Sequence, residues 1–318
     1  MKRRRWWRWV AGGVAVLVVV YLGLGGWFAS RALDRVLTVG VIAEQLEGAT
    51  PPDSPFELGY RGDPMTAFGY AFEDIAVETG LGPTPAWLVP GDAADQTLWA
   101  IYVHGIAGHR EDGYRHLSVL HEAGIPTLMV TYRNDADAPP SEEGIYTFGL
   151  SEWPDLDAAV SYALSAGAER FIIVGESMGG AITGQFLINA PQADRVVALV
   201  LDAPALDLPA VIRAALRSFG IPLSLGIERI ALGLFPPRTG IALNTAVSID
   251  AVVDFPGPLF IAHGSGDRIV PVSISDRVVD RRDAPTTYVR TAGDHLQSWH
   301  ENPERYRAAL LGFLADIR

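Results

Sequence analysis

The sequence predicts an α/β fold, with a mostly parallel central sheet of about eight strands and helices on both faces. From about residue 56 onward, short apolar runs alternate with helix-length segments, and this alternation is typical of parallel strands joined by helical crossovers. The chain has 318 residues, of which 49 % are hydrophobic. It is therefore long enough for one large domain with a sizeable core and one additional segment.

The additional segment lies at the N-terminus, where a basic and aromatic stretch precedes an uncharged one. Residues 1–9 read MKRRRWWRW, and residues 10–29 contain no charged side chain. A helix of about 20 residues spans about 30 Å, the thickness of a bilayer core. Tryptophans lie at both ends of the uncharged stretch, as interfacial anchors do. We therefore expect a transmembrane helix at 10–29, with 1–9 as a cytoplasmic tail and the remaining chain outside.

The main alternative for this segment is a signal peptide that is removed after export, which would give a secreted protein. The sequence GLG at 23–25 offers a small-x-small cleavage site, but the apolar run is longer than the usual hydrophobic region of a signal peptide. After the span, residues 30–55 are expected to form a juxtamembrane linker. It begins as a helix over 30–47 and ends in a stretch stiffened by a proline pair. The folded domain is expected at 56–318.

The charge of the chain is unevenly distributed and argues against a nucleic-acid partner. The net charge is −12, yet the first 35 residues hold seven basic residues and one acidic residue. The remaining chain carries 18 basic and 36 acidic residues and would be repelled by nucleic acid. Composition leaves the oligomeric state open.

The residue types that are missing restrict the chemistry further. The chain contains no cysteine, which excludes disulfides, thiolate metal sites, a cysteine nucleophile and a lipid-modified cysteine. It also lacks the H-E-x-x-H, EF-hand and Walker A patterns. We therefore expect no metal and no organic cofactor.

Strand and helix signals follow one another in order along the domain. Residues 72–79 and 85–89 predict a hairpin-like pair of strands because glycine and proline turn residues lie between them. A glycine follows each of two helical segments, as is typical of helix C-termini, and a proline lies near the start of the last helical segment, as is typical of helix N-termini. Further strands are expected at 98–103, 125–132, 171–174, 195–201, 259–263 and 286–290, and further helices at 113–123, 154–166, 181–190 and 303–317.

One segment interrupts this alternation. Residues 205–256 separate two expected strands by far more than an ordinary crossover. Within this segment, 210–219 and 225–234 are apolar and of helical length, and prolines follow both. They are either an insert that covers a site or ordinary helices that pack on the sheet.

The stretch FIIVGESMGG at 171–180 carries the sharpest chemical signal. Four apolar residues predict a buried strand, and a helix is expected after the G-x-S-x-G pattern. A turn of this kind exposes the hydroxyl of Ser177 at the N-terminus of a helix, where the helix dipole favours negative charge. Gly175 and Gly179 leave room for the close neighbours of the turn. A plain glycine-rich turn is the alternative.

This strand, serine turn and helix resemble the nucleophile elbow of the α/β-hydrolase superfamily of serine esterases, lipases, thioesterases and peptidases. The resemblance covers residues 60–318 and implies that Ser177 is the nucleophile, since dehalogenases and epoxide hydrolases of this fold have an aspartate at the elbow. In this superfamily an insert such as 205–256 resembles a helical cap over the active site. The order of the catalytic groups along the chain is serine, acid, histidine.

The resemblance places the base and the acid in two loops near the C-terminus. His295 lies in TAGDHL after the last expected strand, where the base of the family belongs, and His300 is the reserve candidate. Asp267 lies in HGSGDRIVP after the penultimate strand and looks like the acid that orients the base. Asp202, after the strand at 195–201, is the alternative acid.

The remaining histidines and one further acid are expected to have structural roles. His263 would shape the loop that bears the acid, and Asp294 would make a hydrogen bond within its own loop. His109, His116 and His121 are expected to be solvated residues of a loop or helix.

The oxyanion of an acyl-transfer reaction needs two backbone N–H donors. Met178, directly after the serine, should supply one of them. By resemblance the second comes from the loop HGIAGH at 104–109, where Ile106 donates. Gly105 permits the tight turn of this loop, and His104 supports it.

These residues predict a membrane-anchored serine hydrolase that cleaves carboxylic esters or thioesters through an acyl-enzyme. Apolar or lipid-like acyl groups are the expected substrates, because the segment 205–256 offers Leu, Ile and Phe and the anchor holds the protein beside lipids. Two alternatives remain. One is a serine peptidase that uses the same three residues, and the other is a non-catalytic protein that binds a lipid or a partner.

Overall fold

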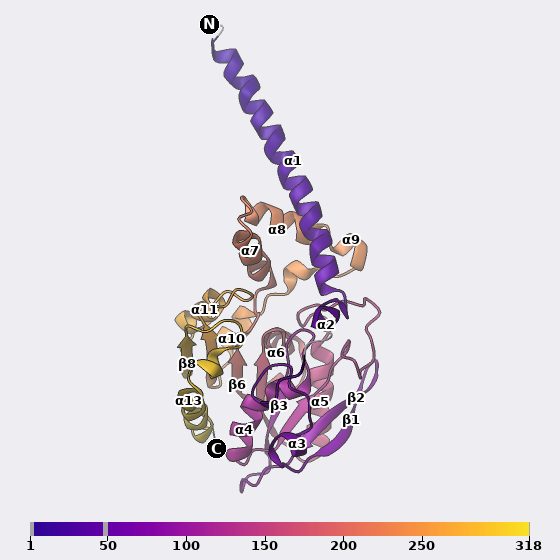
Figure 1. Ribbon diagram of the computed structural model, residues 1–318, viewed down its shortest axis with the longest axis vertical. Coiled ribbons are helices and arrows are strands. Elements are labelled where there is room, and N and C mark those ends of the chain that lie inside the picture. Colours follow the sequence, from indigo (N-terminus) through magenta and orange to yellow (C-terminus); the bar gives the residue numbers. More distant parts are fainter. Residues whose placement is uncertain (1–2, 47–49, 318) are drawn as a thin grey trace.

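An eight-stranded sheet forms the centre of the molecule, in the order β1-β2-β4-β3-β5-β6-β7-β8 (Figure 1). The computed structural model describes residues 3–46 and 50–317. The hairpin of β1 and β2 pairs antiparallel with β4, and all other neighbours pair parallel. The strands are β1 (Glu73–Thr79), β2 (Gly82–Val89), β3 (Leu98–Val103), β4 (Thr127–Val130), β5 (Arg170–Glu176), β6 (Val196–Asp202), β7 (Leu259–Gly264) and β8 (Thr286–Thr291). The expected mostly parallel α/β sheet is confirmed.

Helices cover both faces of the sheet, which explains why its central strands are apolar throughout. In β3, the side chain of Ile101 joins the core on one face, and those of Ala100 and Tyr102 join the core on the other. The first face carries α5 (Trp153–Ser165), α6 (Met178–Asn189), α10 (Ile249–Asp254) and α11 (Ser273–Arg281). The second carries α4 (Tyr114–Glu122), α12 (Ser298–Glu301) and α13 (Pro303–Ala315).

The N-terminal helix α1 (Arg3–Leu37) projects far from the body of the molecule (Figure 1). Its part from Trp6 to Leu37 is long and apolar enough to cross a membrane by length and composition. It does not stop at residue 29. Because no glycine or proline lies between residues 30 and 37, the helix continues to Leu37, and it ends before Gly40, which has φ of 89°.

The expected juxtamembrane helix over 30–47 is therefore wrong in its bounds. Its first part belongs to α1, and a separate short helix, α2 (Val41–Leu46), follows the turn. Residues 47–49, where the expected helix ends and the linker begins, lie outside the described residues, as do the first two residues of the expected tail.

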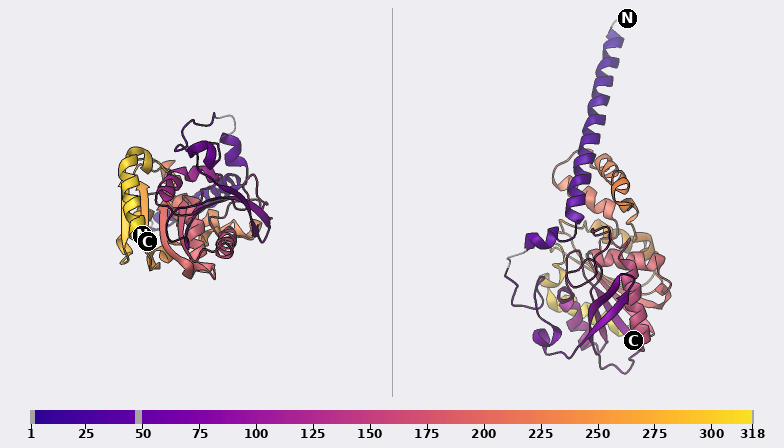
Figure 2. Two further views of the ribbon diagram at one scale, coloured as in Figure 1. Left: turned by 90° about the horizontal axis from the view of Figure 1, so that it is seen from below. Right: turned by 90° about the vertical axis from the view of Figure 1, so that its right-hand side faces the viewer.

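The segment 205–256 forms several short helices, some of which stand above the sheet and one of which packs in the body. Its first part, α7 (Leu208–Ser218) and α8 (Ser224–Gly233), stands above the sheet beside α1 (Figures 1 and 2). Its last part, α10, packs against α6 and α11 in the body. Only the first part is thus placed as a cap, while the last part is an ordinary packing helix. The remaining short elements are α3 (Pro64–Phe68), η1 (Arg110–Gly113), η2 (Ala193–Arg195), α9 (Pro236–Thr239) and η3 (Leu243–Thr245).

The half of α1 next to the body is packed against this cap. A Cβ on Gly26 would lie 2.6 Å from the Cβ of Ile230, so α1 and α8 approach more closely than any larger residue would permit. The Tyr21 hydroxyl donates a hydrogen bond to the carbonyl of Pro222 at 3.0 Å, and Arg238 donates to the hydroxyl of Ser30 at 2.9 Å. This half of α1 is part of the folded domain.

Candidate active site

Ser177 occupies a strained turn between β5 and α6. It is the single residue between Glu176, the last of the strand, and Met178, the first of the helix. Its backbone has φ of 50° and ψ of −115°, a conformation that costs a non-glycine residue free energy and is found mostly at functional sites. The Ser177 N–H donates to the carbonyl of Asp202 at 3.0 Å, which ties the turn to β6. The residue is 6 % exposed.

The two glycines of the motif are required by close approach of the backbone. A Cβ on Gly179 would lie 2.7 Å from the carbonyl oxygen of His104, and one on Gly175 would lie 2.8 Å from the carbonyl oxygen of Gly179. Neither space admits a side chain, because the obstructing atoms belong to the backbone. Helix α6 therefore starts directly against β5 and the loop after β3.

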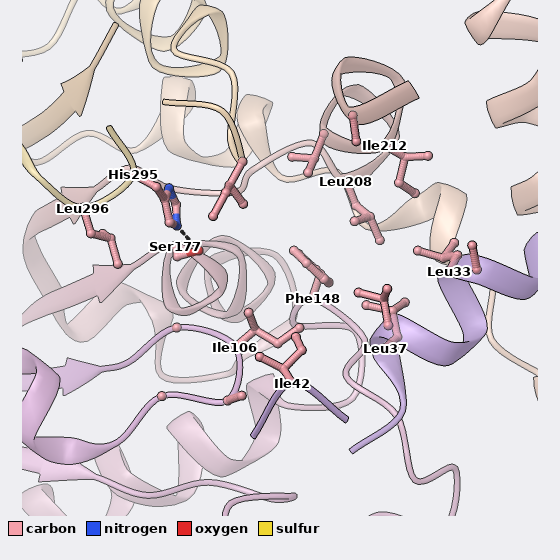
Figure 3. A pocket seen from close by; sticks show the side chains of 18 of the residues that line it. Leu33, Leu37, Ile42, Ile106, Phe148, Ser177, Leu208, Ile212, His295 and Leu296 are labelled. Atoms are coloured by element: carbon pink, nitrogen blue, oxygen red, sulfur yellow. Dashed lines mark hydrogen bonds between the residues drawn. The ribbon is translucent and has the colours of Figure 1, made fainter. Parts of the chain in front are cut away.

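His295 lies between Ser177 and Asp267. Its Nε2 is 3.0 Å from the Ser177 Oγ, and its Nδ1 is 2.6 Å from the Asp267 Oδ2. Figure 3 shows the imidazole next to the serine at one end of a pocket. The structure thus brings together the three side chains that the sequence singled out, from the ends of β5, β7 and β8.

Asp267 is held as a carboxylate by its surroundings. Its Oδ1 accepts the backbone N–H groups of Ile269 and Val270 at 2.8 Å each, and its Oδ2 lies 3.1 Å from the Nε2 of His263. Burial by itself would raise the pKa of Asp267, but the hydrogen bonds from His263 and His295 outweigh it and hold the pKa below its ordinary value. The expected role of His263 in shaping this loop agrees with these contacts.

The alternative acid and base lie elsewhere. The Asp202 carboxylate is buried and accepts a hydrogen bond from the Tyr306 hydroxyl at 3.0 Å. The Nε2 of His300 lies 3.4 Å from Glu57. Asp294 accepts the N–H of His295 at 2.8 Å, which is a loop hydrogen bond of the kind expected.

The loop after β3 lies against the serine and offers backbone donors. A Cβ on Gly105 would lie 3.2 Å from the Ser177 Cβ. Within residues 3–46 and 50–317, no carbonyl or side chain accepts a hydrogen bond from the amide of Ile106 or of Met178. Neither of these two amides is therefore committed to another group among the described residues, and their role as oxyanion donors stays a prediction.

Two residues that sequence reasoning missed hold this loop. The His104 Nε2 lies 2.9 Å from the Asp135 Oδ2, and the Tyr132 hydroxyl donates to the carbonyl of Gly105 at 3.0 Å. Burial lowers the pKa of His104, but the neighbouring Asp135 carboxylate outweighs this effect and leaves the pKa raised. The polar loop after β4 gave no signal for this role, because the contact joins segments about thirty residues apart.

The expectation of a solvated His116 is wrong. Its side chain is buried beneath the serine turn, with the Nδ1 3.0 Å from the Glu176 Oε1. Arg115 donates to the same oxygen at 2.6 Å, and the Tyr102 hydroxyl donates to Oε2 at 2.8 Å. Burial would raise the pKa of Glu176, but the Arg115 guanidinium outweighs it and lowers the pKa to about 2. Glu176 ends an apolar strand, and a buried carboxylate is unfavourable unless a polar or charged group pairs with it. This position was the signal in the sequence that pointed to a buried partner.

Among the described residues, one group of side chains places three metal-ligating atoms within 4.8 Å of one another, namely His116, Glu176 and Asp202. The guanidinium of Arg115 already neutralises Glu176 and would repel a cation at this point. We therefore interpret the group as a buried ion-pair cluster that supports the serine turn. The absence of a cofactor stays a prediction from the sequence.

A large apolar pocket leads away from Ser177 and His295. It has a volume of about 1460 Å³, and its walls come from α1, α7, the loop after β3 and the turn at Phe148. In Figure 3, Leu33 and Leu37 of α1 lie across the pocket from Leu208 and Ile212 of α7. The contribution of α1 to the pocket was not predicted, because the folded domain was expected to begin at residue 56, after the span and the linker.

Comparisons with known proteins agree with the fold. The alpha/beta hydrolase family model matches residues 100–309. An uncharacterised protein of Mycobacterium tuberculosis is 28 % identical over 239 residues, covering 74 % of each chain. An esterase of Pyrococcus furiosus has a TM-score of 0.63 at 18 % identity, over 85 % of this chain and 99 % of the esterase. A puromycin-hydrolysing peptidase of Mycobacterium tuberculosis has a TM-score of 0.62 at 18 % identity, over 81 % of this chain and 41 % of the peptidase. Because the family model spans most of the domain, the chain belongs to the α/β hydrolase family.

Proposed function

We propose that this protein is a membrane-anchored serine hydrolase that cleaves carboxylic esters or thioesters of apolar acyl groups. The observation that carries the proposal is the chain of contacts from Ser177 through His295 to Asp267 at the end of an apolar pocket. A serine hydroxyl is a poor nucleophile near neutral pH unless a base accepts its proton and a third group orients that base. The three residues have the contacts that these roles need.

The proposed reaction proceeds in two halves. His295 accepts the proton of the Ser177 hydroxyl through Nε2, and the serine oxygen bonds to the acyl carbon. The N–H groups of Ile106 and Met178 stabilise the resulting oxyanion. When the carbonyl re-forms, the bond to the leaving group breaks and His295 donates its proton to the departing alcohol or thiol. Water then attacks the acyl-enzyme by the same route and releases the acid, while Asp267 stabilises the charged imidazole.

The pocket favours an ester of an apolar acid over a peptide. Most of the residues that line it are aliphatic or aromatic, and they extend far from the serine along α1 and α7. A peptide would bring several amide groups into these walls, where their hydrogen bonds to water would be lost. Both an esterase and a peptidase share this fold, so the fold itself does not separate the two activities.

We infer that residues 10–29 are an anchor and not a signal peptide that is removed. Tyr21 and Gly26 of this stretch contact α8 and its preceding turn, so cleavage near residue 25 would remove part of the packing of the cap. Basic residues precede the span, which places the N-terminus in the cytoplasm and the domain outside. Protease added to intact cells should degrade the domain. Degradation only after permeabilisation would contradict this orientation.

The proposal is tested on the full-length protein in mild detergent with a fluorophosphonate probe. Covalent labelling of the wild type, absent from Ser177→Ala, is expected, and the readout is the mass of the protein. Butyryl esters and matched butyryl amides are then compared. Ester turnover without amide turnover supports the proposal, whereas amide turnover at a similar rate favours the peptidase. A folded protein that neither labels nor turns over esters would contradict a hydrolase.

A further inference from the structure

We propose that the substrate is an ester lipid of the membrane itself, which enters the site sideways between α1 and helix α7 of the cap. In this arrangement the anchor helix is also a wall of the acyl-binding pocket. The inference rests on the proposed function and adds the source and the route of the substrate.

One face of α1 lines the pocket over much of its length. The lining residues recur at intervals of three and four, so they form a single stripe on the helix. The stripe covers about 24 Å of helix. It begins inside the uncharged span and ends beside the candidate site. Its members are Tyr21, Gly25, Phe28, Ala29, Ala32, Leu33, Val36 and Leu37.

Helix α7 supplies the facing wall with the same periodicity. Its lining residues begin at Leu208, near the candidate site, and end at Leu216, after which Phe219 and Ile221 continue the wall. At the far end of the pocket the Tyr21 hydroxyl contacts the carbonyl of Pro222, so the two walls lie side by side there. The pocket is therefore an apolar passage that extends from the serine to the level of the proposed membrane span.

The tip of the cap is exposed and apolar. Phe219 is 80 % exposed and Leu223 is 55 % exposed, and both lie in the turn between α7 and α8. This turn is level with the uncharged part of α1, because Gly226 at the start of α8 faces Leu22. Large apolar side chains in water at such a place are unfavourable, whereas they are stable when inserted into the acyl region of a bilayer. The far end of the pocket would then open into lipid.

The acidic and basic side chains of the pocket are confined to its other end. Arg61, Asp112 and His109 line it near the loop after β3, on the side of the serine, and Glu176 and His295 lie beside the serine itself. A molecule that fits this distribution has a polar end next to Ser177 and an acyl chain that extends toward the membrane. An ester lipid drawn up from the adjacent leaflet has this shape and would not need to leave the bilayer entirely.

The first test narrows the passage at α1. Ala32 lines the pocket, and Ala32→Trp is compared with Ala15→Trp, an exposed position on the same helix outside the pocket. Wild type and variants in detergent are given methylumbelliferyl palmitate and methylumbelliferyl butyrate. Exclusion of two methylenes should lower kcat/KM for palmitate by about tenfold or more. Butyrate turnover by Ala32→Trp should fall by a much smaller factor than palmitate turnover, and both activities of Ala15→Trp should match the wild type. Equal loss on both esters, or no loss on palmitate, would overturn the proposal.

The second test follows the route of entry. The wild type is reconstituted in phosphatidylcholine vesicles, with methylumbelliferyl palmitate either in the same vesicles or in separate ones. Hydrolysis is expected to be at least about tenfold faster when enzyme and ester share a bilayer, and equal initial rates would overturn lateral entry. Soluble methylumbelliferyl butyrate is measured in parallel. If the butyrate is hydrolysed, the protein is still assigned as a hydrolase even when lateral entry fails. If the butyrate is not hydrolysed, the hydrolase assignment is contradicted.

Discussion

Each residue of the candidate triad is held in place by a different kind of contact. The backbone of Ser177 is held at φ of 50° in the tight turn between β5 and α6. Two backbone N–H groups donate hydrogen bonds to the Oδ1 of Asp267, which fixes the carboxylate. Its Oδ2 contacts His263 and His295. His295 depends on Asp267 for its orientation. We therefore expect loss of the Asp267 charge to lower the rate more than it lowers the stability.

Asp267→Asn should lower kcat for a short-chain ester by about 10⁴-fold, because the amide no longer favours the tautomer of His295 that accepts the serine proton. The measurement is steady-state hydrolysis of methylumbelliferyl butyrate. Asp294→Asn is the matched control, since its side-chain oxygen can still accept the N–H of His295. The assignment of the acid is wrong if the two variants have similar rates.

The buried Glu176 cluster should be visible in the acid stability of the protein. The pKa of Glu176 is lowered from 4.5 to about 2. Its ionisation therefore stabilises the fold fully above about pH 4.5, and this contribution is lost as the pH falls toward about 2. Glu176→Gln should be less stable at neutral pH by about 3 kcal/mol, because Arg115 is left without its charge partner.

The unfolding midpoint is to be followed by circular dichroism as a function of pH. The wild type should lose stability over this acidic interval, and Glu176→Gln should lose less over the same interval. Glu304→Gln, at an exposed position in α13, is the control and should follow the wild type. Parallel curves for all three proteins would contradict the role of the cluster.

Sequence patterns identified the residues whose signals are local. The motif around Ser177 and the loops that hold Asp267 and His295 each combine a strand end with a short polar pattern, and the structure brings them into contact. Their catalytic role stays a prediction. Asp135 and His116 could not be found in this way, because their partners come from other segments and their own neighbours in sequence resemble an ordinary loop and an ordinary amphipathic helix.

At the scale of the elements, the sheet was predictable and the placement of α1 was not. Each central strand is a continuous apolar run because it is buried on both faces, so it is recognisable without its neighbours. Helix α1 is equally recognisable as a span, but its packing on α8 depends on which glycines face the cap. Gly12, Gly13 and Gly23 have open space beside them, whereas Gly26 is enclosed.

Gly26→Val should separate α1 from α8. The added side chain would overlap Ile230, and overpacking of this kind costs about 1–3 kcal/mol. A lower unfolding temperature is expected in differential scanning fluorimetry, together with slower hydrolysis of a palmitoyl ester. Gly23→Val introduces the same residue three positions away, where nothing lies within 4 Å of its Cβ. It should behave as the wild type, and equal unfolding temperatures for the two variants would argue against the α1–α8 contact.

At the scale of the whole molecule, helix α1 and the domain share one apolar interior. Ile227 of α8 is buried partly by Gly25 of α1, so removal of α1 exposes both the cap and the pocket. A chain that begins at residue 38 should self-associate in detergent-free buffer, because the apolar side chains that α1 covers would then be exposed, and large exposed apolar patches promote aggregation. A chain that begins at residue 21 keeps these contacts and should self-associate less. Sedimentation velocity distinguishes the two outcomes, and identical behaviour of both chains would contradict the shared interior.

The unbroken helix from Arg3 to Leu37 has one more consequence. Under the proposed anchoring, and with a lipid of the same membrane as the substrate, this helix keeps the candidate site beside the bilayer. Such an enzyme samples its substrate in two dimensions, so the quantity that sets its rate is the mole fraction of the ester among the surrounding lipids. Inert lipid then acts as a competitive diluent, whereas the volume of buffer around the membrane is without influence. Lipid composition itself becomes the regulator of turnover.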